Sequence, residues 1–336
     1  MSNVHYRVAV VGGGGIAEAH LEAIDRSERL TAVAVADIAT DRAKRLGERF
    51  GIASYSDYQD MLARERPDIA VVTLPHYLHK EAAVYAAQLG CHVMLEKPMA
   101  IDADECDAIV AAVRANRVKL MVGHTQHYSD TNALAKEWIA SGRLGRLVMI
   151  NDRRHLPYDK PSRPDWFFEK AKAGGGILTN LGSHTIDKIQ WLIDGTVTKV
   201  KASVDYALGR GDVEGSGIAF FDTDAGIPAT MCLSGYPGAV VDETELLFTR
   251  GSIRLQTGVG LWVSEGGEYM EQAVPPLRDP FLLQFEDLLR AIEDDAEPAC
   301  SMAYSRSVVA AVQGLYRSHE LGREIQVESE AEGNDR

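Results

Sequence analysis

The chain has 336 residues, 46% of them hydrophobic, and a formal net charge of −14 at pH 7. This length allows two domains, because single hydrophobic cores stop growing near roughly 250–300 residues. The negative charge argues against a nucleic-acid partner bound through its phosphates, and the absence of any run of about 18 apolar residues argues against a membrane span.

The first 125 residues alternate short apolar runs with amphipathic stretches. The predicted strands are Val8–Val11, Thr31–Asp37, Asp68–Pro75, Cys91–Glu96 and Lys119–Gly123. The predicted helices are Glu18–Arg29, Arg42–Phe50, Tyr58–Arg66, His79–Leu89 and Ala103–Asn116. This alternation is typical of βαβ units and predicts an α/β fold with a Rossmann-like, doubly wound parallel sheet.

The pattern changes after a predicted helix at Asp130–Ser141. Further strands are predicted at Leu147–His155, Val200–Leu208, Ser216–Phe221, Ala229–Ser234, Glu243–Thr249 and Ser252–Gln256. Further helices are predicted at Ser183–Ile193, Pro280–Asp294 and Met302–Leu321. We therefore expect a Rossmann domain at residues 1–125, and an α+β domain with a largely antiparallel open sheet at residues 126–327. Residues 328–336 are expected to form an acidic, disordered tail.

The four cysteines, Cys91, Cys106, Cys232 and Cys300, form no Cys-x-x-Cys pair and no cluster. Dispersed thiols are typical of buried side chains in a reducing compartment, so we expect neither a disulfide nor a metal site. The N-terminal residues lead directly into a strand and lack the pattern of a signal peptide. These features predict a cytoplasmic protein.

A glycine-rich turn joins the first predicted strand to the first helix. It fits G-x-G-x-x-(G/A), with Gly12 at the turn, Gly14 at the closest approach to a pyrophosphate, and Ala17 packed on the strand. Gly15 and Ile16 would open the helix, whose N-terminal amides attract phosphate. Glycine-rich turns are common, but a strand before and a helix after favour a dinucleotide site.

Asp37 ends the second strand, and Ile38 follows it. An acidic residue at this position binds the ribose hydroxyls of NAD. Its charge would repel the additional phosphate of NADP, so NAD is the expected cofactor, although nearby Arg42 keeps NADP possible. The alternative is a structural aspartate that caps a turn or helix.

Polar residues also follow the next two strands at their carboxyl ends, where open α/β sheets bind ligands. These residues are Leu74, Pro75, His76 and His79 after one strand, and Glu96, Lys97 and Pro98 after the other. The first group either contributes to a nicotinamide-ribose pocket or forms a polar loop. Lys97 is either a surface lysine or a group that titrates and transfers protons. Pro98 stiffens its turn and is a candidate for a cis peptide bond.

A second polar cluster follows a glycine-rich loop at residues 174–176. His184 lies near the start of a predicted helix and is a candidate general acid or base. Asn180 can orient a hydroxyl but cannot take its proton. Asp187 can pair with His184 along the helix. The alternative is that His184 is a structural histidine.

Five other residues are candidates for ligand binding. They are Gln126 and His127 after the fifth strand, Arg153 and His155 at the end of a strand, and Trp166 before the glycine loop. Gln126 and His127 would face the nicotinamide or the substrate. An arginine can bind hydroxyls or a carboxylate, and a tryptophan can stack on a sugar face. The alternatives are a solvated strand end and an ordinary core tryptophan.

Together and in this order, these motifs resemble those of the Gfo/Idh/MocA oxidoreductases. The resemblance rests on the glycine loop, Asp37, Pro75-His76 with His79, Glu96-Lys97-Pro98 and the glycine–His184–Asp187 segment, and it covers nearly the whole chain. It implies NAD(P)-dependent hydride transfer at a secondary alcohol of a sugar, sugar derivative or cyclitol. It also implies a homodimer or homotetramer that associates through the second domain, which binds the substrate.

The resemblance assigns roles to single residues. Lys97 matches the family's catalytic lysine, and His184 matches the histidine of the inositol-dehydrogenase active site. The catalytic aspartate of those enzymes is Asn180 here, which predicts that Lys97 and His184 share proton transfer. The segment 123–128 also departs from many relatives, which carry an arginine before an aromatic residue there.

Two other functions exist on this fold. One is an enzyme that retains NAD and uses transient oxidation for elimination or glycoside cleavage. The other is a non-catalytic, ligand-sensing regulator. The presence of both Lys97 and His184 favours an enzyme over a regulator.

Overall fold

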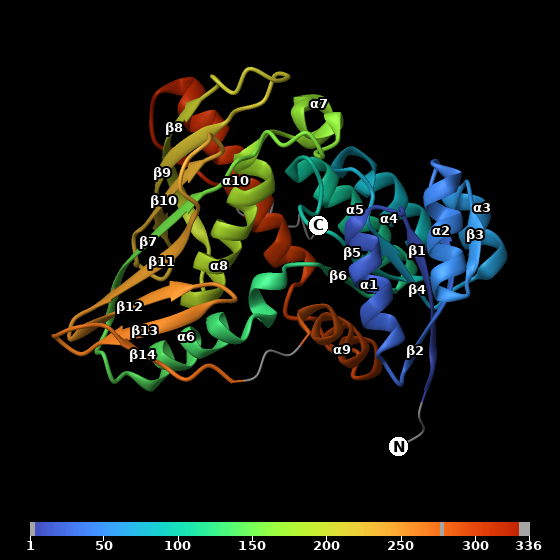
Figure 1. Ribbon diagram of the computed structural model, residues 1–336, viewed down its shortest axis with the longest axis horizontal. Helices are drawn as coiled ribbons and strands as arrows, with labels where there is room; N and C mark the ends of the chain where they lie inside the picture. Colours follow the sequence, from blue (N-terminus) through green and yellow to red (C-terminus); the bar gives the residue numbers. More distant parts are fainter. Residues whose placement is uncertain (1–3, 276–278, 329–336) are drawn as a thin grey trace, which may run out of the picture. The chain divides into compact units, whose positions relative to one another are not determined.

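The computed structural model describes residues 4–275 and 279–328 (Figure 1). The chain forms two compact units, one of Met1–Thr125 with Asp279–Arg306 and the other of Gln126–Arg278 with Ser307–Arg336. The segment Asp279–Arg306 was expected in the second domain but groups with the first, because α9 (Pro280–Glu293) packs on α1 (Gly15–Asp25). Apart from Glu328, the expected acidic tail lies outside the described residues.

A parallel sheet of six strands in the order β3-β2-β1-β4-β5-β6 forms the centre of the first unit. Its strands are β1 (Tyr6–Val11), β2 (Leu30–Ala36), β3 (Ala53–Tyr55), β4 (Ile69–Val72), β5 (His92–Leu95) and β6 (Leu120–Val122). This order confirms the predicted doubly wound sheet. The strand order reverses between β1 and β4, and ligands bind at the carboxyl ends of the strands on either side of such a point.

The helices of the first unit begin and end where local sequence directs them. After α1 they are α2 (Thr40–Phe50), α3 (Tyr58–Glu65), α4 (His79–Gln88), α5 (Ala103–Asn116) and α9. The Asp102 side chain accepts a hydrogen bond from the Glu105 amide and caps α5. Gly51, with φ of 67°, ends α2 in the left-handed conformation that glycine adopts without strain.

The second unit contains a nine-stranded sheet in the order β14-β13-β12-β11-β7-β10-β9-β8-β15. Its strands are β7 (Leu147–His155), β8 (Val197–Asp205), β9 (Ser216–Thr223), β10 (Ala229–Ser234), β11 (Val241–Phe248), β12 (Gly251–Gln256), β13 (Gly260–Ser264), β14 (Met270–Glu271) and β15 (Ile325–Gln326). Only β7 and β10 pair in parallel among the described strands of this sheet, which confirms the prediction of a largely antiparallel sheet.

Helices cover one face of this sheet (Figure 1). The helices of this part of the chain are α6 (Asp130–Ser141), α7 (Lys170–Ala173), α8 (Ser183–Ile193) and α10 (Met302–Leu321). Asp152 of β7 is buried against α8, where it binds Thr185 and Lys188. Side chains alternate along a strand, so Arg153 points to the opposite, open face of the sheet.

Candidate active site

The glycine loop after β1 is anchored on its inner side and open on its outer side. Gly12 has φ of 99°, and a Cβ there would lie 2.8 Å from the carbonyl oxygen of Thr73. The Gly12 amide donates to the Ala36 carbonyl at 2.8 Å. Apart from their neighbours in the chain, no atom of the described residues lies within 4 Å of a Cβ position at Gly14 or Gly15, so a ligand could approach the backbone closely there. The loop therefore fits a pyrophosphate at the N-terminus of α1.

Asp37 organises the same loop. Its Oδ2 accepts the Gly13 amide at 2.8 Å, its Oδ1 accepts the Ala39 amide at 2.7 Å, and Arg42 pairs with it at 3.0 Å. Asp37 thus supports this turn, and a carboxylate with about four lone-pair sites can accept further hydrogen bonds from ribose hydroxyls. Ile38 is 91% exposed beside it.

His79 joins the loops that follow β4 and β5. Its Nδ1 lies 2.8 Å from the Pro98 carbonyl oxygen and its Nε2 lies 2.8 Å from the Leu74 carbonyl oxygen. Burial lowers the pKa of His79 below its ordinary value, and the hydrogen bonds to these two carbonyls only partly offset this shift. The side chain is fully buried, so His79 supports the site from below rather than lining its surface. The Lys97–Pro98 peptide bond is cis.

Glu96 holds the backbone of Lys97. Its Oε1 lies 2.9 Å from His20 Nε2, and its Oε2 accepts the Lys97 amide at 3.2 Å. Burial raises the pKa of Glu96, but the hydrogen bond and charge of His20 and the charges of Lys97 and His79 outweigh it, so the net shift is downward. A buried carboxylate therefore fixes the start of the loop that carries the half-buried Lys97.

His20 is a site residue that sequence analysis missed. It lies on α1, and the rings of Phe281 and Phe285 on α9 meet it edge-on at 5.0 and 5.7 Å. A histidine within an amphipathic helix gives no sequence signal of this role, because its partner Glu96 lies on a different element.

In the second unit, Asn180 and His184 lie on one continuous helical segment. Residues Leu178–Gly182 form a π-helical turn, η4, that leads directly into α8. Asn180 is buried within this turn, and His184 is half-buried in the first turn of α8. Wide turns of this kind are uncommon and are often found at functional sites.

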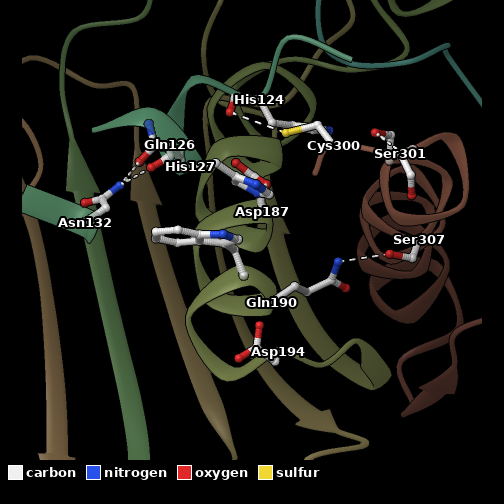
Figure 2. A network of polar contacts seen from close by, with 12 residues as sticks. His124, Gln126, His127, Asn132, Asp187, Gln190, Asp194, Cys300, Ser301 and Ser307 are labelled. Carbon is white, nitrogen blue, oxygen red and sulfur yellow. Dashed lines mark hydrogen bonds and ion pairs between the residues drawn. The ribbon is translucent and has the colours of Figure 1, made fainter. Parts of the chain in front are cut away.

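Asp187 and His127 form a buried hydrogen-bonded pair (Figure 2). Asp187 Oδ1 lies 2.7 Å from His127 Nε2, and the imidazole stacks on Trp191 with ring centroids 5.1 Å apart. Gln126 is also buried, and its side-chain and main-chain oxygens accept hydrogen bonds from Asn132. These contacts show that His127, Gln126 and Asp187 brace α6 and α8.

The structure does not bring Arg153 and His155 together with His184. Arg153 pairs with Glu243 at 2.7 Å, and His155 lies 3.6 Å from the sulfur of Cys232. Arg153, Glu243 and Cys232 line a cavity on the open face of the sheet, opposite the face that packs against α8. Trp166 stacks on Phe167 with ring centroids 3.8 Å apart.

In residues 4–275 and 279–328, no group of three or more His, Cys, Asp or Glu residues is arranged to hold a metal ion. Within the same ranges, no helix is both long and apolar enough to cross a membrane. The four cysteines are free thiols.

Two domain profiles of one protein family match the chain. Residues 6–124 match the oxidoreductase family with an NAD-binding Rossmann fold, and residues 132–254 match the GFO/IDH/MocA C-terminal domain. The two matches fall in the two compact units and together cover most of the chain. The first unit is thus an NAD-binding domain.

Two of the named relatives are dehydrogenases. A 1-carboxy-3-chloro-3,4-dihydroxycyclohexa-1,5-diene dehydrogenase of Comamonas testosteroni is 31% identical over 70% of this chain and 60% of its own length. The levoglucosan dehydrogenase of Pseudarthrobacter phenanthrenivorans is 30% identical over 55% of this chain and 50% of its own length. The chain thus spans between half and two thirds of the length of these relatives.

Solved structures show the same fold over almost the whole chain. A levoglucosan dehydrogenase in complex with NADH superposes with a TM-score of 0.88, at 21% identity, over 97% of this chain and 100% of the other.

Proposed function

Because the chain belongs to the Gfo/Idh/MocA oxidoreductase family, we propose that it is an NAD-dependent dehydrogenase. It would transfer hydride from a secondary alcohol of a sugar, sugar derivative or cyclitol to the nicotinamide. The observation that carries this proposal is the open glycine loop, which follows β1 and is anchored to Thr73 and Asp37. Lys97 follows β5 of the same parallel sheet. The activities named for the two relatives support it.

NAD would bind along the carboxyl edge of the first sheet. The open backbone of Gly14 and Gly15, with Ile16, would hold the pyrophosphate, and Asp37 would bind the adenosine ribose. Leu74, Pro75 and His76 would lie beside the nicotinamide ribose. Bound NAD supplies the hydride acceptor. The buried charge of Asp37 favours NAD over NADP, and Arg42 leaves some use of NADP.

Oxidation of the alcohol releases one hydride and one proton, so the protein must accept the proton. Lys97 is half-buried and has its backbone held by Glu96, which suits an amine that accepts a proton or stabilises a developing alkoxide. His184 would share this role, and Asn180 would orient a neighbouring hydroxyl. The side-chain amide of Asn180 cannot accept a proton, so it cannot replace the catalytic aspartate that inositol dehydrogenases carry at this position.

We infer that the active species is a homodimer or homotetramer formed through the open face of the second sheet. Met149, Ile218 and Phe220 are exposed on this face. Apolar side chains gathered on one sheet face are typical of an interface. Ile218→Asp should shift the mass measured by light scattering to that of a smaller species. An unchanged mass would contradict this assignment. The free thiols favour a reducing, cytoplasmic location.

The function is tested by a screen of neutral sugars, cyclitols and sugar acids for NADH formation, run with NAD and with NADP. Lys97→Ala should lower kcat by about 10²–10⁴, the usual worth of a positioned proton-transfer group, while NAD affinity is unchanged. Lys80→Ala is the matched control, because Lys80 lies in the same unit and pairs only with Glu105 at 2.7 Å among the described ion pairs.

Three outcomes would contradict the proposal. Normal turnover of Lys97→Ala would remove this residue from the mechanism. Conversion of a sugar without NADH release, by protein purified with bound NAD, would favour the NAD-retaining enzyme. A sugar that alters binding of another protein without being oxidised would favour the regulator.

A further inference from the structure

Glu214 is a buried carboxylate that none of the predicted motifs includes. It precedes β9 and is 1% exposed. Both its oxygens accept the Gly176 amide, at 2.9 and 2.8 Å, and Oε1 also accepts the Leu178 amide at 2.8 Å. The Gly176 amide lies just before the helical segment that begins at Ile177, and the Leu178 amide lies in its first turn. No side chain of that segment's own caps them. Glu214 therefore caps this helix from another part of the chain.

Tyr316 of α10 completes the cap. Its hydroxyl donates to Glu214 Oε1 at 2.9 Å and lies 2.9 Å from the Thr179 hydroxyl. Because tyrosine has one hydroxyl proton and gives it to the carboxylate, Thr179 must donate to Tyr316. The chain of hydrogen bonds thus runs from Thr179 in η4 through Tyr316 to Glu214.

The glycine loop at residues 174–176 is shaped around these two residues. A Cβ on Gly175 would lie 2.0 Å from the Tyr316 hydroxyl, and a Cβ on Gly176 would lie 2.3 Å from the Glu214 carbonyl oxygen. Such approaches are too close for any side chain, so the loop reaches Glu214 and Tyr316 only because it consists of glycine.

The converging donors favour the ionised form of Glu214. Burial raises the pKa of Glu214 above its ordinary value, and the amides of Gly176 and Leu178 and the Tyr316 hydroxyl only partly oppose this shift. The positive end of the helix dipole also favours a negative charge at this site.

We propose that Glu214 and Tyr316 are positioning residues for the reaction. They fix η4, whose wide turn is less favourable than an α-helical turn and needs support from outside. Asn180 lies within η4, and its backbone amide donates to the Gly176 carbonyl at 3.0 Å. His184 follows in the first turn of α8. Glu214 thus sets where these two side chains meet the substrate. Only the expected effect on kcat rests on the proposed function.

The test compares Glu214→Gln and Tyr316→Phe with a control, Thr223→Val. Thr223 forms two hydrogen bonds with Ile227 at the far end of β9, about 23 Å along the strand at about 3.3 Å per residue. Glu214→Gln should lower kcat about tenfold to a hundredfold, the scale of a 1 Å misplacement, with NAD affinity unchanged. Tyr316→Phe should act in the same direction and more weakly, and Thr223→Val should retain kcat at a similar loss of melting temperature.

A second measurement does not depend on activity. Hydrogen exchange at the amides of Gly176 and Leu178 should be slow in the native protein and at least about tenfold faster in Glu214→Gln, since a protecting hydrogen bond is weakened. If no sugar is oxidised but this exchange result holds, the proposed function fails and the cap stands. If the native enzyme is active and both variants keep the kcat of Thr223→Val, the positioning role is refuted. Tyr316→Phe carries the test if Glu214→Gln does not fold.

Discussion

Removal of Lys188 tests how α8 is held on the second sheet. Lys188 Nζ lies 2.9 Å from Asp152 Oδ2, and the two side chains are 2% and 0% exposed. Asp152 also accepts hydrogen bonds from the hydroxyls of Thr185 at 2.8 Å and Thr244 at 2.7 Å. Lys188→Met retains most of the aliphatic volume but removes the charge that faces the buried carboxylate, and the two hydroxyls still donate to it.

The expected cost follows from the burial of this pair. Removing one partner of a buried ion pair lowers the free energy of unfolding by about 3–5 kcal/mol, because the other charge stays out of water. For a unit of this size the melting temperature should fall by roughly 6–20 °C. Replacing both charges is often nearly neutral, so Asp152→Asn in the same protein should restore most of the loss.

The cost should also depend on pH. Burial raises the pKa of Asp152, but Lys188 and the two threonine hydroxyls outweigh it, so the folded pKa lies below 3.8. This depressed pKa contributes stability that is present above pH 3.8 and is lost as the pH falls through the folded pKa. Without Lys188, burial dominates and the pKa of Asp152 rises. The penalty in Lys188→Met should therefore grow from acid to neutral pH.

Urea unfolding between pH 4 and pH 8 measures these free energies. Thr223→Val serves again as the control, because it removes a polar contact of the same unit that does not involve Lys188 or Asp152. A loss below about 1 kcal/mol for Lys188→Met would refute the reasoning, since it would mean that water reaches the carboxylate. A double variant as unstable as the single one would show that the lost stability comes from packing rather than charge.

Three further predictions concern the first unit. Asp37→Ser should reduce the preference for NAD over NADP at least about tenfold, or about 1.4 kcal/mol, because a negative charge near the additional phosphate is lost; the ratio of kcat/KM values measures this, and an unchanged ratio would contradict it. Gly12→Ala should cost about 1–3 kcal/mol of stability and weaken NAD binding in fluorescence titration, since its Cβ would lie 2.8 Å from the Thr73 carbonyl oxygen at positive φ; retained affinity would argue against the loop as the cofactor site. Glu96→Gln should be less stable than the native protein at pH 7, and this loss of stability should shrink as the pH falls below 4.5. The reason is that Glu96, whose pKa is lowered and which pairs with His20, stabilises the fold only while its carboxyl is ionised. A loss of stability that does not change with pH in thermal scans would be inconsistent with this pair.

The amino-acid sequence by itself determined the elements with strong local signals. The helices Ala103–Asn116, Asp130–Ser141 and Ser183–Ile193 have the predicted bounds, as does the strand Ala229–Ser234. Periodic apolar positions, capping aspartates and glycine turns lie close together in the chain, so their effect can be read locally. The same holds for the glycine loop, whose strand and helix adjoin it.

Elements that depend on a partner strand could not be predicted. The strands β3, β14 and β15 have three, two and two residues, too few for a periodic pattern. They are strands because neighbouring strands pair with them, β3 with β2 and β15 with β8. The grouping of Asp279–Arg306 with the first unit likewise depends on packing between α9 and α1.

The tertiary structure alone decided which of the predicted polar residues are buried and support the fold, and which are exposed. His79 is buried below the loops, His127 pairs with Asp187 across 60 positions of sequence, and Glu214 caps a helix that begins 37 residues before it. Arg153 points away from α8 because strand geometry sends alternate side chains to opposite faces. Hydrogen bonds and ion pairs join atoms that are close in space, and distance along the chain carries no information about such contacts.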